Sequence, residues 1–285
     1  MIDLHTHTTA SDGTFTPAEL VNAAKALGLE ALAITDHDTF DGYDEARPLA
    51  EAAGLPLICG IEVSTNLPRP DGGRARSVHL LAYFFAEPPQ SIRSWIIGQQ
   101  QMRRERNAAL VARLNELRVE ITLDEVRELG KNMMGRPHFA QILLRKGYVK
   151  TLQEAFDRYL GETGVAYVEK HDPGLEEAVE AITHCGGIAS LAHPVRIGLP
   201  AAPERDLILR VKGLGMQAIE VHHSDHSAEH RELYGSIASE FGLAVTGGSD
   251  FHGGNKPEVD LGTGRRGNVR VPRELLDRLR EIARA

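Results

Sequence analysis

The sequence of 285 residues contains little cysteine, few aromatic residues and no long apolar run. Its two cysteines, Cys59 and Cys185, are too few for a disulfide framework, so we expect two free thiols in a reducing compartment. The absence of a run of about 18 apolar residues predicts no membrane-spanning helix and no membrane partner. The first residues lack a basic region followed by an apolar segment, so we predict a cytoplasmic protein without a signal peptide.

Basic residues are in the minority, with 32 Lys and Arg against 40 Asp and Glu and a formal net charge of −8. Nonspecific binding of duplex DNA requires a basic surface, so duplex DNA is not an expected partner. A local positive site is still compatible with this charge. Hydrophobic residues make up 42% of the chain and charged residues 25%, which is typical of a soluble globular protein with a sizeable core.

Seven short apolar runs rich in Val, Ile and Leu predict β-strands that alternate with helices. These runs cover residues 2–5, 31–35, 56–63, 78–84, 187–192, 218–222 and 244–248. Thr16-Pro17-Ala18-Glu19, after the first run, is a capping box with proline at the first helical position. Strands separated by helices favour parallel pairing and an α/β architecture. A polar segment at 68–73 predicts a hairpin loop between the third and fourth strands.

Residues 91–160 show no strand pattern, and helix signals follow one another there. Thr122-Leu123-Asp124-Glu125 and Thr151-Leu152-Gln153-Glu154 are both capping boxes. We therefore predict an all-helical insertion domain over 91–165, which acts as a lid or contacts the substrate. The insertion would divide one α/β domain into residues 1–90 and 166–285.

Thirteen histidines are present, and many of them stand with acidic residues where a predicted strand ends. The groups are His5, His7 and Asp12; Asp36 and His37; Glu62; His79; His193; His222 and His223; and Asp250 and His252. The carboxyl ends of strands in an α/β barrel form the rim where catalytic residues converge. Imidazole and carboxylate ligands without cysteine suit an open catalytic site for zinc, manganese or iron. We expect His171, His184, His226 and His230, which fall in predicted helices or linkers, to be ordinary surface residues.

His5-Thr6-His7, Asp36-His37, His193-Pro194 and Asp250-Phe251-His252 resemble the four motifs of the PHP (polymerase and histidinol phosphatase) superfamily, in family order over nearly the whole chain. The resemblance implies a distorted (β/α)7 barrel with two to three divalent ions, manganese being expected and zinc or iron the alternatives. By this resemblance the first ion is held by His5, His7, Glu62 and Asp250, the second by Asp12, His37 and His252, and the third by His79 and His193, which share Glu62.

The first seven residues and the insertion that leads to Gly135-Arg136-Pro137-His138 look like the stand-alone TrpH/YciV-like branch of this superfamily. The branch implies a phosphatase that removes the 3′-phosphate of nucleoside 3′,5′-bisphosphates, such as adenosine 3′,5′-bisphosphate, and that also trims short RNA from the 5′ end. The predicted mechanism is attack of metal-bound hydroxide on phosphorus without a protein nucleophile. Two alternatives are another PHP phosphoesterase, such as a histidinol-phosphate phosphatase, and a non-catalytic PHP binding module.

Five residues are candidates for contact with the nucleotide substrate. Arg136, with His138 beside it, stands at the start of a predicted helix, where a guanidinium can bind phosphate through two hydrogen bonds. Lys170 lies where the chain returns from the insertion, and Arg196 follows His193-Pro194. His222 is a weak candidate for the general acid, and its alternative role is a hydrogen bond to a metal ligand. The alternative for the cations is an ordinary surface charge or a helix-capping salt bridge.

Overall fold

The structure is a computed structural model that describes residues 1–71, 73, 75–130, 134–169 and 172–284. The chain forms two compact units, one made of Met1–Ile96 with Pro173–Ala285 and the other of Ile97–Asp172. Helix α3 (Gln90–Glu116) begins in the first unit and continues into the second. The division therefore lies inside a helix, whereas the sequence suggested a boundary at residue 91. None of the described helices has the length and apolar composition needed to cross a membrane.

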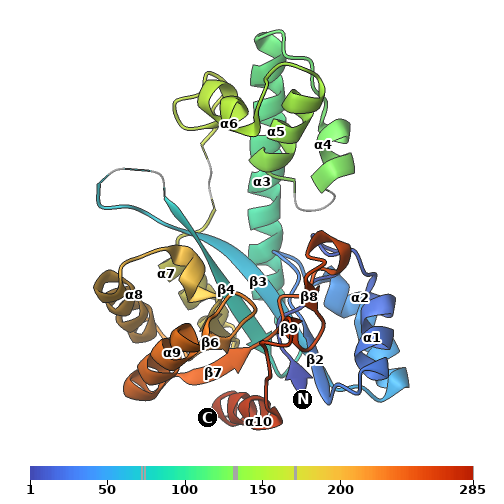
Figure 1. Cartoon of the computed structure of the whole chain (residues 1–285), viewed down its shortest axis with the longest axis vertical. Helices are drawn as coiled ribbons and strands as arrows, with labels where there is room; N and C mark the ends of the chain where they lie inside the picture. The colour runs from blue at the N-terminus through green and yellow to red at the C-terminus, as the bar shows by residue number, and fades with distance from the viewer. Residues whose placement is uncertain (72, 74, 131–133, 170–171, 285) are drawn as a thin grey trace. The chain divides into compact units, whose positions relative to one another are not determined.

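The first unit is built on a seven-stranded sheet whose strands follow one another in sequence order (Figure 1). The strands are β1 (Ile2–Asp3), β2 (Ala31–Ile34), β3 (Leu57–Leu67), β4 (Arg76–Phe84), β5 (Ile188–Leu191), β6 (Ala218–His222) and β7 (Ala244–Gly247). The Leu4 N–H donates to the Gly247 carbonyl at 3.3 Å, and the Asp250 N–H donates to the His5 carbonyl at 2.8 Å. These bonds connect the ends of the first and last strands, so the sheet is nearly closed. The predicted α/β barrel is confirmed.

Strand β4 is the exception to the parallel pairing that the sequence favoured, because it runs antiparallel to both β3 and β5. The other neighbouring pairs are parallel. The reason lies in the connections. The short polar segment after Leu67 turns the chain straight back as a hairpin, and only a helical crossover makes a parallel neighbour. The hairpin between the third and fourth strands is as predicted, and four of the six neighbouring pairs are parallel, in line with the mostly parallel pairing that the sequence predicts.

Helices cover the outside of the barrel, as the alternating pattern predicts. They are α1 (Pro17–Ala26), α2 (Asp41–Ala53), α7 (Leu175–His184), α8 (Ala201–Gly213), α9 (Ala228–Phe241) and α10 (Arg273–Ile282). The capping box of α1 is confirmed, since the Glu19 N–H donates to Thr16 Oγ1 at 3.2 Å and the Thr16 N–H donates to the Glu19 carboxylate at 2.8 Å. A short antiparallel pair, β8 (Val259–Asp260) and β9 (Gly264–Arg265), follows the barrel and was not predicted.

Among its described residues the second unit contains helices joined by turns and loops, and no strand. Beyond α3 it contains α4 (Leu123–Gly130), α5 (Arg136–Arg145), α6 (Leu152–Ala155) and the π-helical turn η2 (Phe156–Leu160). The predicted cap at Thr122 is present, because the Thr122 N–H donates to the Glu125 carboxylate at 2.9 Å. The unit has a hydrophobic core of its own, which includes Leu114, Phe139 and Leu143.

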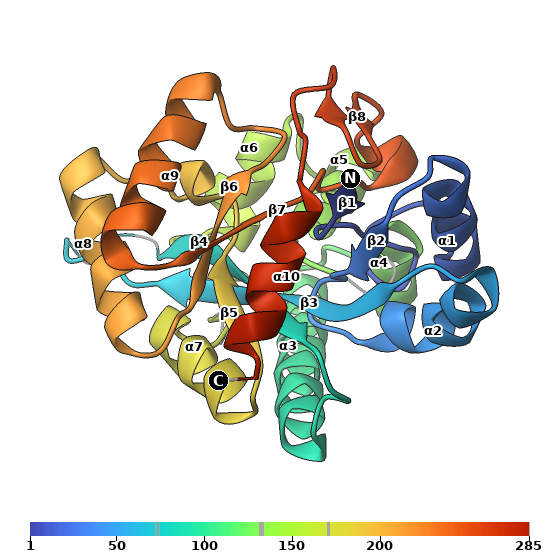
Figure 2. The same cartoon turned by 90° about the horizontal axis from the view of Figure 1, so that it is seen from below.

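An apolar layer inside the barrel supports the strand that carries the first histidines. Ile2, Leu4 and Leu81 are fully buried and pack in one cluster with residues of α10, which lies across the sheet in Figure 2. Tyr83 on β4 is also fully buried, and its hydroxyl donates to the Leu4 carbonyl at 2.9 Å. This bond fixes the backbone directly before His5.

We predict that Tyr83→Phe lowers the free energy of unfolding by about 1–3 kcal/mol, because it leaves the buried Leu4 carbonyl without its donor. Urea denaturation of the metal-free protein measures the change. Tyr43→Phe is the matched control, since the Tyr43 hydroxyl makes no hydrogen bond among the described residues, and it should change stability by less than about 0.5 kcal/mol. Equal losses for the two variants would show that the Tyr83 bond contributes nothing of its own.

Candidate metal centre

Glu62 on β3 is the centre of a buried group of histidines. Its Oε1 atom lies 2.7 Å from Nδ1 of His79 on β4 and 2.8 Å from Nε2 of His193, which follows β5. Its Oε2 atom faces Nε2 atoms at 3.1 Å for both His5 and His7 and at 3.5 Å for His37. One carboxylate therefore lies among five histidines from four segments that are far apart in the sequence.

The position of Glu62 within its strand differs from the prediction. We expected it at the end of a strand, but β3 continues to Leu67 and Glu62 lies near its middle. His79 likewise lies within β4, opposite Ser64 of β3. Because the long β3–β4 hairpin extends beyond the neighbouring strands, side chains from its middle reach the level at which the shorter strands end.

The two carboxylate oxygens of Asp250 contact different neighbours. Oδ1 faces the Nε2 atoms of His5 and His7, each at 3.4 Å. Oδ2 accepts hydrogen bonds from Lys256 Nζ at 2.6 Å and Arg196 Nη2 at 3.0 Å. Asp250 therefore connects the histidine cluster on one side with two cations on the other.

A half-exposed carboxylate stands at the edge of the cluster. Asp12 Oδ1 lies 3.2 Å from His252 Nε2 and 3.6 Å from His7 Nδ1, and its Oδ2 atom lies 3.9 Å from His37 Nε2. Asp12 is 41% exposed, whereas His252 is 3% exposed. Solvent therefore reaches the cluster at this edge, through Asp12.

The structure brings all nine predicted ligands into one cluster. Three overlapping sets have their potential ligand atoms within 4.8 Å of one another: His5, His7, Glu62 and Asp250; His7, Asp12, His37 and His252; and His37, Glu62 and His79. His193 joins the third set through its contact with Glu62. The first set has the same members as in the family resemblance, whereas the second also includes His7 and the third includes His37, so the assignment of ligands to individual ions stays a prediction.

Two observations show that these residues fit divalent ions. Among the described residues, His7 Nε2 and His37 Nδ1 are buried without a hydrogen-bond partner, although His7 Nε2 lies 3.1 Å from Glu62 Oε2. Buried polar atoms are seldom left without a partner. The donor set of imidazole nitrogen and carboxylate oxygen is the one that zinc, manganese and iron accept. The cluster is therefore a candidate metal centre.

The protonation states of some ligands suit metal ligation directly. For His5 and His7, burial lowers the pKa, but the surrounding carboxylates outweigh it and raise the pKa of both, that of His7 to about 9, so these two imidazoles must lose a proton when a metal ion binds. Burial lowers the pKa of His37 to about 4 and that of His193 to about 3, so both imidazoles are neutral near pH 7. Burial raises the pKa of Glu62, but the surrounding histidines outweigh this effect and hold it well below its usual range. Neutral imidazoles and ionised carboxylates are the forms that bind metal.

Backbone strain accompanies two of the ligands. His193 has φ +26° and Asp250 has φ +58°, a conformation that residues other than glycine seldom adopt. Such conformations persist where the surrounding structure holds them, and they are frequent at functional sites.

Gly248 allows the chain after β7 to lie close to the chain after β1, because a Cβ atom at this position would lie 2.3 Å from the His5 backbone nitrogen.

Comparison with known proteins agrees with this geometry. A family model described as the PHP domain matches residues 3–185. The chain belongs to the PHP domain family. It is 34% identical over 250 residues to the 5′-3′ exoribonuclease of Haemophilus influenzae, covering 88% of this chain and 89% of the relative. It is 32% identical over 263 residues to the 3′,5′-nucleoside bisphosphate phosphatase of Chromobacterium violaceum, covering 92% and 90%.

Two solved PHP structures resemble the whole chain. A candidate metal-dependent phosphoesterase of Bifidobacterium adolescentis is 33% identical, with a TM-score of 0.73 and coverage of 98% of this chain and 94% of the other. An amidohydrolase of Chromobacterium violaceum, solved with bound sulfate and no metal, is 32% identical, with a TM-score of 0.75 and coverage of 97% and 96%. The predicted family and fold are confirmed.

The predicted substrate residues of the PHP barrel differ in their placement. Arg196 is at the metal centre, where it donates to Asp250 at 3.0 Å and to Asp225 at 2.8 Å. His222 is not at the metal centre, because among the described residues it makes no hydrogen bond or ring contact with a predicted ligand. A register shift in β6 between Glu220 and His222 accompanies this placement, and the neighbouring His223 contacts Asp250 at 3.3 Å instead. The role of His222 as general acid stays a prediction.

The other predicted substrate residues belong to the helical unit. Arg136 is buried, donates to the Leu160 carbonyl at 3.4 Å and places its guanidinium 5.8 Å from the ring of Tyr167. His138 Nδ1 accepts a hydrogen bond from the Gly135 N–H at 3.1 Å, so its imidazole caps the first turn of α5. Lys170 lies outside the described residues.

Several residues of the PHP site had no role in the predictions from sequence, although His223 was noted at the end of a predicted strand. Glu220 and His223 are fully buried within the site, and Lys256 contacts Asp250. A charged residue inside the apolar strand at 218–222 was the available signal for Glu220. The expected surface location of His226 is wrong, because the loop after β6 folds back so that His226 Nδ1 lies 2.8 Å from the Val221 carbonyl. His184 is exposed and His230 partly so, and His171 lies outside the described residues.

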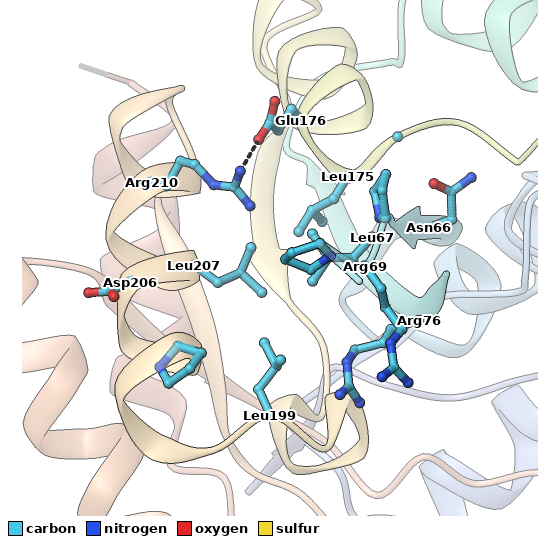
Figure 3. Close-up of a pocket in the computed structure, with 14 residues that line it drawn as sticks. Asn66, Leu67, Arg69, Arg76, Leu175, Glu176, Leu199, Asp206, Leu207 and Arg210 are labelled. Atoms are coloured by element: carbon cyan, nitrogen blue, oxygen red, sulfur yellow. Dashed lines mark ion pairs between the residues drawn. The ribbon is translucent and has the colours of Figure 1, made fainter. Parts of the chain in front are cut away.

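A cavity of about 640 Å³ in the same unit is separate from the metal centre (Figure 3). It lies between the β3–β4 hairpin, α7 and α8, over an apolar lining that includes Leu67, Leu175, Leu199 and Leu207. Arginines at its edge have partners within the unit, since Arg210 pairs with Glu176 at 2.9 Å and Arg76 donates to the Ile197 carbonyl at 3.0 Å. Among the described residues, no predicted ligand or substrate residue lines the cavity.

We predict that elemental analysis of protein purified from manganese-supplemented cells finds two to three divalent ions per chain. Asp250→Asn should lower this number and abolish phosphatase activity while the circular dichroism spectrum stays unchanged, because the amide is a poorer metal ligand than the carboxylate. Asp225→Asn is the control for metal content, since Asp225 pairs with Arg196 but belongs to none of the ligand sets. Full activity in protein stripped of metal would contradict the assignment.

Proposed function

We propose that this PHP protein is a metal-dependent phosphomonoesterase that removes the 3′-phosphate from nucleoside 3′,5′-bisphosphates, such as adenosine 3′,5′-bisphosphate. Phosphoester hydrolysis is the activity that the family and the names of its relatives support. The observation that carries the finer proposal is the complete ligand cluster with two cations beside it, on Asp250. A relative named for the same reaction covers 92% of this chain.

In the proposed site, metal ions and side chains make different contributions to hydrolysis. When bound, divalent ions, with manganese expected and zinc or iron as alternatives, supply hydroxide at neutral pH and neutralise the charge on phosphate oxygens. The chain contributes the ionised Glu62 and Asp250 that hold such ions. Arg196 and Lys256 can donate charge-assisted hydrogen bonds to an incoming phosphate. This local positive charge is compatible with a chain whose formal net charge is −8.

Trimming of short RNA from its 5′ end is the second candidate, because relatives in Haemophilus influenzae and Escherichia coli are named 5′-3′ exoribonucleases. In residues 97–172, which form the helical unit, basic residues outnumber acidic ones, although the chain as a whole is acidic. A basic segment favours a polyanion such as RNA. The intact ligand set argues against the non-catalytic alternative, and no observation favours histidinol phosphate.

The deciding experiment compares phosphate release from four substrates in one colorimetric assay. We expect adenosine 3′,5′-bisphosphate to exceed adenosine 3′-monophosphate in kcat/KM, because binding of the remote 5′-phosphate helps to orient the reacting group. Histidinol phosphate and a short 5′-phosphorylated RNA, with RNA cleavage followed on a gel, test the alternatives. Equal values for the two adenosine nucleotides would reduce the proposal to a generic phosphatase.

Arg136 is the proposed contact of the remote 5′-phosphate. A second arginine of the same unit, Arg106, is also buried, its Nε atom has no hydrogen-bond partner among the described residues, and burial lowers its pKa to about 10. Burial of a guanidinium is costly unless an anion or other acceptor compensates it. These features support a phosphate-binding role for this part of the helical unit.

Arg136→Ala should lower kcat/KM for the bisphosphate by about 10- to 150-fold, since a charge-assisted bond of this kind is worth about 1.5–3 kcal/mol. Its effect on adenosine 3′-monophosphate should be small. Thermal denaturation of the variant provides the control, because Arg136 is buried and also bonds the Leu160 carbonyl. A similar loss on both substrates would assign Arg136 to the fold and not to the 5′-phosphate.

A further inference from the structure

Glu220 is a fully buried glutamate that none of the predicted ligand sets includes. It lies on β6, and its two carboxylate oxygens have different partners. Oε1 lies 2.9 Å from His5 Nδ1, and Oε2 accepts a hydrogen bond from the His193 backbone N–H at 2.7 Å. One side chain thus contacts two candidate ligands that belong to different strands of the barrel.

The contact with His5 determines which imidazole nitrogen is free for a metal ion. An ionised carboxylate only accepts hydrogen bonds, so the proton of His5 must be on Nδ1. In the neutral imidazole that binds a metal ion, the lone pair is then on Nε2, and this atom faces Glu62 Oε2 at 3.1 Å and Asp250 Oδ1 at 3.4 Å. The hydrogen bond to Glu220 therefore orients the ligand atom of His5 toward the other ligands of its set.

The contact with His193 acts on the backbone. His193 has φ +26° and ψ +61°, and a residue with a side chain keeps such a conformation only where its surroundings hold it. Glu220 Oε2 accepts the N–H of this residue, while the imidazole Nε2 lies 2.8 Å from Glu62 Oε1. Glu220 thus binds the backbone N–H of His193, and Glu62 contacts its imidazole.

Glu220 could instead be a ligand, because His5, Glu220 and His223 also lie close enough to hold an ion. The hydrogen bonds argue against this alternative. Both oxygens of Glu220 already accept bonds within the protein, and His5 Nδ1 is one of the donors. His223 Nδ1 accepts the Asp225 N–H at 3.0 Å, so the proton of His223 is on Nε2, which donates to Asp250 at 3.3 Å. His223 thus has no free lone pair in this arrangement.

We infer that Glu220 is a positioning residue of the metal centre, which fixes the tautomer of His5 and the backbone of His193 so that both imidazoles present Nε2 to the ions. This inference rests on the proposed function only in that the cluster binds divalent ions. It does not depend on which phosphoester is hydrolysed. Hydrogen-bond partners of metal ligands commonly affect metal affinity by about 10- to 100-fold.

The test is a titration of the full-length, metal-stripped protein with Mn²⁺, followed by electron paramagnetic resonance of the free ion. Glu220→Gln should raise the Kd for Mn²⁺ by about 10- to 100-fold, because the amide offers one acceptor oxygen where the carboxylate offers two. Glu204→Gln is the matched control. Glu204 is a buried glutamate of the same unit, which accepts a bond from Tyr234 at 3.2 Å, and its substitution should leave the Kd unchanged within about twofold.

Wild-type affinity in Glu220→Gln would overturn the inference, and so would equal losses in the two variants, which would indicate a general effect of removing a buried charge. If Glu220→Gln does not fold, ¹⁵N-histidine spectra of the zinc-loaded wild-type protein decide. A proton on His5 Nδ1 supports the inference, and a proton on Nε2 overturns it. A wild-type protein that binds Mn²⁺ but releases no phosphate from nucleotides would reject the proposed function alone.

Discussion

The ionised carboxylate of Glu62, buried among five histidines, is the interaction on which the rest of the site depends. Its two oxygens are within 3.5 Å of nitrogen atoms on all five. Burial of a charge is costly unless opposite charge or hydrogen bonds compensate it, so these histidines have to converge on one point. That requirement links the ends of β1, β2 and β5 to the middle of the β3–β4 hairpin, and it explains why the barrel closes tightly at this level.

The reversal of β4 follows from the same constraint. If β4 followed β3 through a helical crossover, a ligand near its start would lie at the opposite end of the barrel. The antiparallel hairpin places His79, near the beginning of β4, opposite Ser64 and beside Glu62. Polar residues that are not predicted ligands complete the arrangement: Glu220 accepts bonds from His5 and His193, and Lys256 and Arg196 bond the outer oxygen of Asp250.

Local patterns in the sequence predicted the seven strands, the helical insertion and the cap at Thr16, because each depends on short-range periodicity or on capping residues. The grouping of the metal ligands came from the family resemblance and stays a prediction. The polar segment at 68–73 predicted the β3–β4 hairpin and with it the reversal of β4 against β3. The antiparallel pairing of β4 with β5 depends on a long connection and was not predictable from local pattern. Glu220 contacts His5 over 215 positions of sequence, so its charge inside an apolar strand is a local signal that something pairs with it, but the partner itself is not predictable locally. His226 looked like a loop residue, and its burial arises only when the loop folds over β6.

We propose that the histidine and carboxylate cluster at the barrel rim is a divalent metal centre for phosphoester hydrolysis. X-ray anomalous scattering at the manganese edge, from crystals of the protein grown with Mn²⁺, is the decisive measurement. We expect anomalous peaks between Glu62, His5, His7 and Asp250 and beside Asp12, His37 and His252. Crystals that contain manganese but show no anomalous peak within this cluster would contradict the proposal.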